Sequence, residues 1–155
     1  FLKKKNFVED KSAKSLSFFF KGKDSEAILD YNLIKLIKKI SKLLNKNLRI
    51  NLHKDIYEKY HDMIILQRKK TYIKPHRHVS GGETVHMLHG KMTILLMNYK
   101  GKVIKKILMD TKKNVVYRVP YKNFHTYRIE TPFALYHENK SGPFIKNKNT
   151  IFLKK

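Results

Sequence analysis

The amino-acid sequence predicts an all-β barrel that is preceded by a single amphipathic helix. Short apolar segments, many of them alternating with polar residues, recur at roughly ten-residue spacing through residues 49–138, as expected for strands. Turn-forming Gly, Pro and Asn residues separate these segments. Before them, the apolar residues follow a helical spacing. Many short strands behind one helix are typical of a small barrel or sandwich.

The chain has 155 residues, 41% of them hydrophobic, which is enough for one domain with a buried core. Residues 1–24 are rich in Lys and Ser and are interpreted as an N-terminal extension. Their apolar patch at residues 16–20 could form an edge strand on the main body. Residues 25–155 are predicted to form a single domain, which starts with a helix over about residues 25–46.

The predicted helix has a start signal, an apolar face and an end signal. Asp24 and Ser25 can cap its first turn, and Asn45 lies where the apolar spacing stops. The polar face consists largely of lysines, which would also suit an anionic membrane surface. We favour a helix that docks on the core, because it lacks the Trp and Phe residues typical of interfacial helices.

The rest of the domain is predicted to consist of strands that are joined by polar or glycine-containing turns. Ser141-Gly142-Pro143 breaks the last of these strands. The predicted strands cover residues 49–53, 63–68, 71–78, 83–88, 92–97, 103–109, 115–119, 124–129 and 133–138.

Two histidines and a glutamate lie on one predicted hairpin. His76 and His78 are two residues apart, so in a strand their imidazoles point to the same face. Gly81 and Gly82 form the turn, because glycine adopts turn conformations at low cost. Glu83 opens the return strand and brings an oxygen to the two nitrogens. This hairpin therefore supplies most of a metal site.

The candidate for the remaining ligand is His125. It begins an alternating strand after a turn at Pro120, so its side chain can point into the barrel. Three neutral imidazoles and one carboxylate suit one divalent transition metal, namely Fe, Mn, Ni, Co or Zn. His86 and His89 lie on the same predicted strand as Glu83, but we expect neither to be a ligand, and His86 is out of phase with the glutamate.

The spacing of these residues resembles the two sequence motifs of cupins. The corresponding elements are His76-x-His78-x4-Glu83-x6-Gly90 and, further along, Pro120-x4-His125.

The chain departs from the cupin motifs at three glycines, whose positions are occupied by Lys70, Asn114 and Lys122. None of these is a metal ligand in cupins. The resemblance therefore implies a metal set made of His76, His78, Glu83 and His125.

More specifically, the chain resembles WbuC-type cupin-fold metalloproteins from about Leu29 to its C-terminus. This resemblance implies a jelly-roll barrel with one divalent metal, and genes that often neighbour those of surface polysaccharide or nucleotide-sugar metabolism. The resemblance to cupins also suggests a homodimer. The segments that carry the WbuC resemblance are residues 49–53, 61–65, 71–78, 117–118, 125–126 and 137–144.

Other polar residues are candidates for the wall of the same pocket. Arg49, Asn51 and His53 alternate on one strand, so all three could face the metal or, equally, form a polar outer face. His137 and Glu138 are neighbours, so only one of them is expected to point inward. The further pocket candidates are Gln67, Tyr72 and His137.

The formal net charge of +23 suggests nucleic acid or an anionic membrane as a partner. However, only five of the 35 basic residues are arginines, which are the usual readers of bases and the better phosphate clamps. The lysines are spread along the chain among many Ile and Asn residues, as in proteins from AT-rich genomes. We therefore expect no specific nucleic-acid binding and keep polyanion binding as a third hypothesis.

The chain contains no cysteine, and its longest bulky apolar run is far too short to span a bilayer. We find no convincing signal peptide. These features predict a cytoplasmic protein without a membrane span.

The first functional hypothesis is a metal-dependent protein that acts on a sugar or nucleotide-sugar in surface polysaccharide metabolism. Isomerase- or epimerase-like catalysis is slightly favoured, although no catalytic residue is assigned. The alternative is a non-catalytic, metal-dependent carbohydrate-binding or regulatory module.

Overall fold

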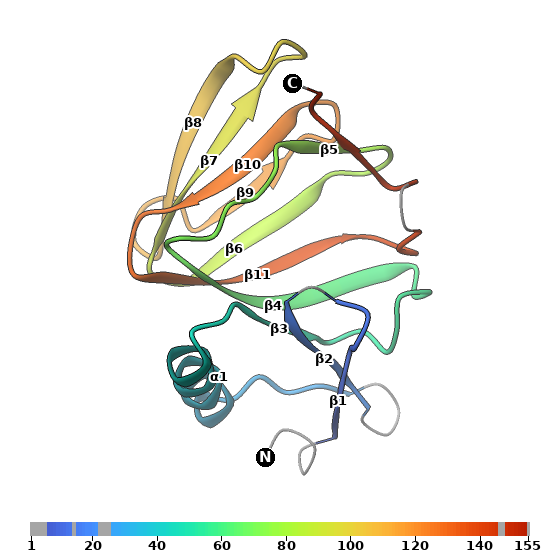
Figure 1. The fold of residues 1–155 in the computed structure, drawn as a ribbon, viewed down its shortest axis with the longest axis vertical. Coiled ribbons are helices and arrows are strands. Elements are labelled where there is room, and N and C mark those ends of the chain that lie inside the picture. Colours follow the sequence, from blue (N-terminus) through green and yellow to red (C-terminus); the bar gives the residue numbers. More distant parts are fainter. Residues whose placement is uncertain (1–5, 14, 22–25, 146–147, 155) are drawn as a thin grey trace.

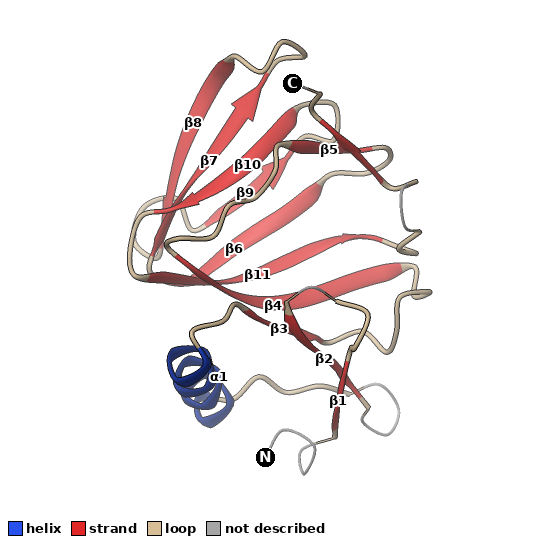
Figure 2. Cartoon of the chain, viewed as in Figure 1, coloured by secondary structure: helices blue, strands red, loops and turns tan. Residues whose placement is uncertain are grey.

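In the computed structural model, which describes residues 6–13, 15–21, 26–145 and 148–154, two β-sheets and one α-helix form three layers (Figures 1 and 2). The seven-stranded sheet has the order β1-β2-β3-β4-β11-β6-β9, and the five-stranded sheet has the order β12-β5-β10-β7-β8. The elements are β1 (Phe7–Glu9), β2 (Leu16–Phe20), α1 (Tyr31–Leu44), β3 (Leu48–Asn51), β4 (Tyr60–Arg68), β5 (His76–His78), β6 (Glu83–His89), β7 (Lys91–Met97), β8 (Val103–Asp110), β9 (Val116–Val119), β10 (Phe124–Ile129), β11 (Phe133–Ser141) and β12 (Thr150–Phe152).

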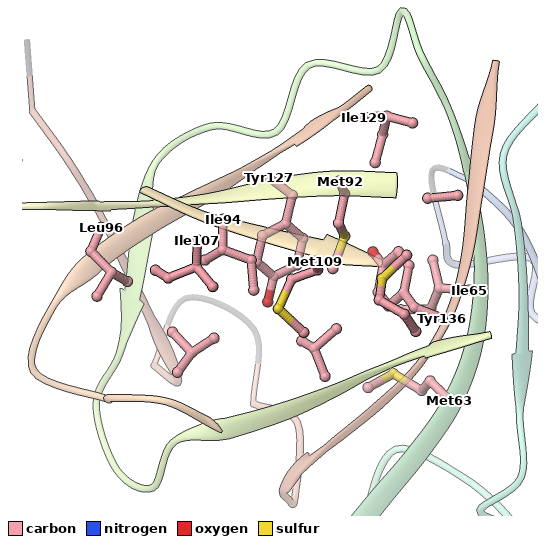
Figure 3. Packing of buried hydrophobic residues seen from close by; sticks show 14 residues of the cluster. Met63, Ile65, Met92, Ile94, Leu96, Ile107, Met109, Tyr127, Ile129 and Tyr136 are labelled. Carbon is pink, nitrogen blue, oxygen red and sulfur yellow. The ribbon is translucent and has the colours of Figure 1, made fainter. Parts of the chain in front are cut away.

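The main hydrophobic core fills the space between the two sheets (Figure 3). Because successive side chains in a strand point to opposite faces, each strand contributes every second residue to this core. Met63 and Ile65 enter from β4, for example, while Met92 and Ile94 enter from β7. The result is a jelly-roll barrel whose interior is packed with side chains, as the sequence predicts.

A second core lies on the other face of the seven-stranded sheet. Here Leu33 and Ile37 of α1 are buried against Ile64 and Leu66, which are the outward-facing residues of β4. The seven-stranded sheet is therefore apolar on both faces, and α1 docks on it as predicted. Figure 1 shows the helix beside β3 and β4, on the side away from the five-stranded sheet.

The helix starts later than predicted. Asp24 and Ser25 lie outside the described residues, and residues 26–30 are not helical. Asp30 is the N-cap, because its side chain accepts a 2.6 Å hydrogen bond from the backbone N–H of Leu33. The predicted end is confirmed, since Asn45 adopts a left-handed conformation with φ of 51° and terminates α1.

Most predicted strands are present, but residues 71–78 form only the short strand β5. Pro75 has no N–H for a ladder hydrogen bond, so regular pairing begins at His76. Residues before it still contact the sheet, because the Thr126 hydroxyl donates to the carbonyl of Ile73.

The apolar patch at residues 16–20 forms β2, which corrects the prediction of an edge strand. Both sides of β2 are paired, with β1 on one side and a parallel β3 on the other. The edge position belongs to β1, which the sequence analysis missed together with β12. Both missed strands have three residues, too few for a periodic pattern to reveal.

Within the described residues, no helix has the length and apolar character that crossing a membrane requires.

The capping role of Asp30 predicts a measurable loss of stability. Asp30→Ala is expected to lower the free energy of unfolding by about 1 kcal/mol, because the N–H of Leu33 loses its acceptor. Asp30→Asn is the matched control and is expected to retain most of the stability, since asparagine caps equally well. Urea denaturation measures both, and equal losses in the two variants would contradict the capping role.

Candidate metal centre

The three histidines of the predicted metal set come from two adjacent strands. His76 and His78 lie on β5, and His125 lies directly opposite His76 on β10. Strand alternation turns all three side chains to the barrel interior. Figure 1 shows β5 and β10 side by side in the five-stranded sheet.

The turn that follows β5 brings in the carboxylate from the opposite sheet. Gly81 has a φ of 65°, which only glycine adopts without strain. A Cβ atom at Gly82 would clash with the carbonyl oxygen of Val119, so the available space also requires glycine there. This turn delivers Glu83 to the start of β6, with its side chain facing the histidines.

The predicted ligands meet in a compact group. One nitrogen each from His76, His78 and His125 lies within 4.8 Å of the others. The Glu83 Oε2 atom lies 2.8 Å from His78 Nε2, and Oε1 lies 2.9 Å from His125 Nε2. His125 and Glu83 are buried, with 0% and 2% of their surface exposed.

The hydrogen bonds of the imidazoles leave nitrogens free for a metal. His76 Nδ1 is 3.0 Å from the carbonyl of Lys74, and His125 Nδ1 is 3.4 Å from the carbonyl of Asn123. A backbone carbonyl at Nδ1 holds the proton on that atom and directs the Nε2 lone pair to a metal. His125 Nε2 is buried and has no hydrogen-bond partner, although it lies 2.9 Å from Glu83 Oε1. These donors therefore fit a divalent metal.

The ionisable side chains of this group shift one another's pKa values. Burial opposes ionisation of Glu83, but the contacts with His125 and His78 outweigh it and hold the pKa of this carboxyl well below its usual range. Burial also opposes protonation of His125, yet Glu83 raises its pKa. For His76, burial and then the charge on His125 lower the pKa to about 4, so this imidazole is neutral at neutral pH.

Tyr127 is a further member of the site that the sequence analysis did not single out. Its hydroxyl donates a hydrogen bond to Glu83 Oε1 in the buried interior. Burial and the nearby Glu83 and Glu138 raise the pKa of Tyr127 well above its ordinary value, so the hydroxyl stays protonated. The sequence could have indicated this role, because Tyr127 lies two residues after His125 and therefore shares its strand face.

The predicted wall of Arg49, Asn51 and His53 is only partly realised. Arg49 and Asn51 share the strand face opposite to the core residues Leu48 and Ile50, so they face the barrel side. The Asn51 amide is used internally, since it donates to the Ser17 hydroxyl and the Phe18 carbonyl.

His53 lies beyond the end of β3, so its place does not follow from strand alternation. Its Nδ1 bonds the backbone of Asp62, and its ring stacks on His61. Among the described residues, no hydrogen bond joins Arg49, Asn51 or His53 to the metal candidates.

The weaker pocket candidates are not brought to the cluster. Gln67 accepts a 2.8 Å hydrogen bond from the Tyr136 hydroxyl inside the barrel. Tyr72 is 78% exposed because it precedes the regular strand. His137 faces the outer side, where its Nε2 lies 3.0 Å from Asp62. This corrects the expectation that Tyr72 and His137 line the pocket.

Of these two neighbours, Glu138 rather than His137 faces the barrel interior. Its side chain shares the strand face of Tyr136, is buried, and lies 3.3 Å from Lys140 Nζ. The sequence analysis recognised that only one of the two neighbours could point inward, but not which one.

A cavity of about 20 Å³ adjoins the cluster at His78. The C-terminal strand β12 covers this side, because it pairs with all of β5, from Thr150 opposite His78 to Phe152 opposite His76. A larger open hollow of about 840 Å³ lies among basic residues such as Arg68 and Lys69. None of the four metal candidates lines that hollow, so it is not part of this site.

Solved structures with a similar fold include cupin-fold proteins such as CapF and oxalate decarboxylase. Protein SO0799 from Shewanella oneidensis is 14% identical, with a TM-score of 0.53 over 62% of this chain and 63% of that one. The capsular polysaccharide assembling protein CapF from Staphylococcus aureus is 12% identical, with a TM-score of 0.55 over 71% and 32%. Oxalate decarboxylase from Bacillus subtilis, described with Mn(II) centres, is 12% identical, with a TM-score of 0.52 over 70% and 28%.

This chain covers less than two thirds of each of these structures, and the low identities show a shared fold only. The chain therefore shares the jelly-roll fold of these structures. Residues 32–109 match the family described as "Domain of unknown function (DUF6016)", so the chain belongs to that family. The matched stretch contains His76, His78 and Glu83, and it ends before His125. No curated protein sequence matches the chain.

The contact between Tyr127 and Glu83 leads to a stability prediction. Tyr127→Phe is expected to lower the free energy of unfolding by about 2 kcal/mol, because its hydroxyl donates to a buried charged group. Tyr136→Phe is the matched control, since this equally buried hydroxyl donates to the neutral amide of Gln67, and about 1 kcal/mol is expected. Chemical denaturation measures both losses. A smaller loss for Tyr127 than for Tyr136 would contradict a charged Glu83.

Proposed function

We propose that the protein binds one divalent transition metal (Fe, Mn, Ni, Co or Zn) through His76, His78, His125 and Glu83. The observation that carries the proposal is the convergence of three imidazole nitrogens and a carboxylate in a buried site. Nitrogen and oxygen donors in this combination suit these metals. The Mn(II) centres of oxalate decarboxylase, which shares the fold, make manganese a reasonable first metal to test.

When bound, such a metal supplies a Lewis acid that polarises a hydroxyl or carbonyl oxygen. The chain's own residues would hold the centre in place. Tyr127 fixes one oxygen of Glu83, and the carbonyls of Lys74 and Asn123 orient His76 and His125. β12 covers the outer edge of β5 and limits access of water from that side.

We further propose that the ligand is a sugar or nucleotide-sugar in surface polysaccharide metabolism. Two likenesses support this substrate class: the WbuC-type sequence pattern, and the shared fold with a protein described as capsular polysaccharide assembling. We favour isomerase- or epimerase-like chemistry in the cytoplasm. Residues 25–155 would act as one domain with residues 1–24 as an extension, and a homodimer stays a prediction.

A non-catalytic, metal-dependent binding module is the second candidate. The observation that favours it is the small cavity of about 20 Å³ beside the histidines. Small-molecule sites are usually hollows of roughly 300–1,000 Å³. In this structure, only a small part of a sugar would reach the metal candidates without movement of the cover.

Metal analysis tests the shared premise. Protein purified without added metal is expected to contain about one divalent ion per chain, and His76→Ala and His125→Ala are each expected to lose most of it, because each removes a nitrogen donor. Elemental analysis by mass spectrometry measures the content.

The matched controls are His86→Ala and His89→Ala, which remove histidines of β6 that lie outside the cluster. Both controls are expected to retain the metal. Full metal content in both His76→Ala and His125→Ala would overturn the proposed site.

An NMR screen of nucleotide-sugars with the metal-loaded protein separates catalysis from binding. Catalysis predicts new sugar resonances that are absent with the His125→Ala variant. Line broadening without any new resonance would favour the binding module.

A further inference from the structure

The cavity beside the histidine cluster is lined by polar groups that the metal proposal does not use. Its volume of about 20 Å³ is enough for one water-sized group. Besides His78, which belongs to the cluster, its wall includes His61 and Lys140. These two residues lie opposite each other on the paired strands β4 and β11.

His61 is a buried imidazole with one unpaired ring nitrogen. Only 4% of the residue is exposed, and its Nε2 atom has no hydrogen-bond partner. Its ring stacks on His53 with a centroid distance of 4.2 Å and an interplanar angle of 6°, which fixes its orientation. Leaving a buried polar atom unpaired is unfavourable, so a ligand that pairs with it gains affinity.

Lys140 brings a positive charge to the same cavity. It lies opposite Glu83 in the ladder between β11 and β6, and its Nζ atom is 3.3 Å from Glu138 Oε1. The half-buried position of the ammonium group makes its charge felt more strongly than on the open surface.

The balance of charge becomes positive once a metal is present. Glu83 and Glu138 are the carboxylates of this region, and Lys140 offsets one of them. A divalent metal would more than offset the other and leave one positive charge in excess. A buried excess charge is unfavourable unless a counter-charge accompanies it, so the loaded site would favour an anionic group.

We propose that one oxygen of a ligand carboxylate enters the cavity between His61 and Lys140, next to the metal centre. Lys140 supplies the counter-charge, and His61 Nε2 supplies a hydrogen bond. The inference rests on the proposed metal function and narrows its ligand to a carboxylate-bearing compound, such as an acidic sugar. A carboxylate carries one negative charge, which matches the single positive charge in excess, whereas a phosphate group carries about two at neutral pH.

An alternative explanation is that Lys140 only neutralises Glu138. That explanation accounts for the contact between Lys140 and Glu138. It leaves unexplained why His61, on the facing strand, keeps a buried nitrogen without a partner at the same cavity.

The test uses the full chain loaded with Co²⁺ and titrated with formate, the smallest carboxylate. Formamide, a neutral compound of similar shape, and inorganic phosphate are titrated in parallel. Calorimetry measures affinity, and elemental analysis measures cobalt. We expect formate to bind, and we expect formamide and phosphate each to bind at least about tenfold more weakly.

Lys140→Gln and His61→Gln are each expected to weaken formate binding by about tenfold or more while cobalt content stays unchanged. Lys106→Gln, which replaces an exposed lysine of β8, is the matched control and is expected to change nothing. His61→Gln is tested as well because Lys140→Gln also removes the ion-pair partner of Glu138.

Each other outcome overturns a defined statement. Failure of the wild-type chain to take up cobalt overturns the metal function and, with it, the inference. Normal cobalt uptake overturns the inference alone in two cases: formate and formamide bind equally, or both glutamine variants bind formate as well as the wild type does. Tighter binding of phosphate than of formate also overturns the carboxylate assignment.

Discussion

The buried charge of Glu83 is the constraint on which the rest of the site depends. A carboxylate with 2% exposure is stable only if hydrogen bonds or opposite charges replace the lost water. His78, His125 and Tyr127 meet this need. His78 belongs to β5, whereas His125 and Tyr127 belong to the neighbouring strand β10. Glu83 itself belongs to the opposite sheet. The carboxylate therefore ties the two sheets together within a polar part of the barrel interior.

Strand alternation explains why the sequence predicts so much of this arrangement. The spacing of His76 and His78, the glycine turn before Glu83 and the position of His125 all depend on the two-residue period of a strand, which holds in the structure. The same period accounts for the jelly-roll fold, because alternating strands supply both the interior core and the face that carries α1.

Other features could not be predicted because they depend on long-range pairing. The two-residue period says that His137 and Glu138 point to opposite faces, but the choice between them follows from the pairing of β11 with β4. His53 fails as a wall residue because β3 ends at Asn51, a boundary that no local pattern marks. His61 and Lys140 lie on separate strands, so their shared cavity becomes visible only in the folded chain.

The pairing of β12 with β5 has a consequence for biosynthesis. Translation runs from the N-terminus, so His76, His78 and Glu83 leave the ribosome well before His125, and β12 follows later still. A nascent chain at that stage carries two imidazoles and a carboxylate on a hairpin whose outer edge has no partner. β12 can therefore cover the histidine cluster only after residues 150–152 have been made. A chain released before that point would expose this hairpin to metal ions in solution.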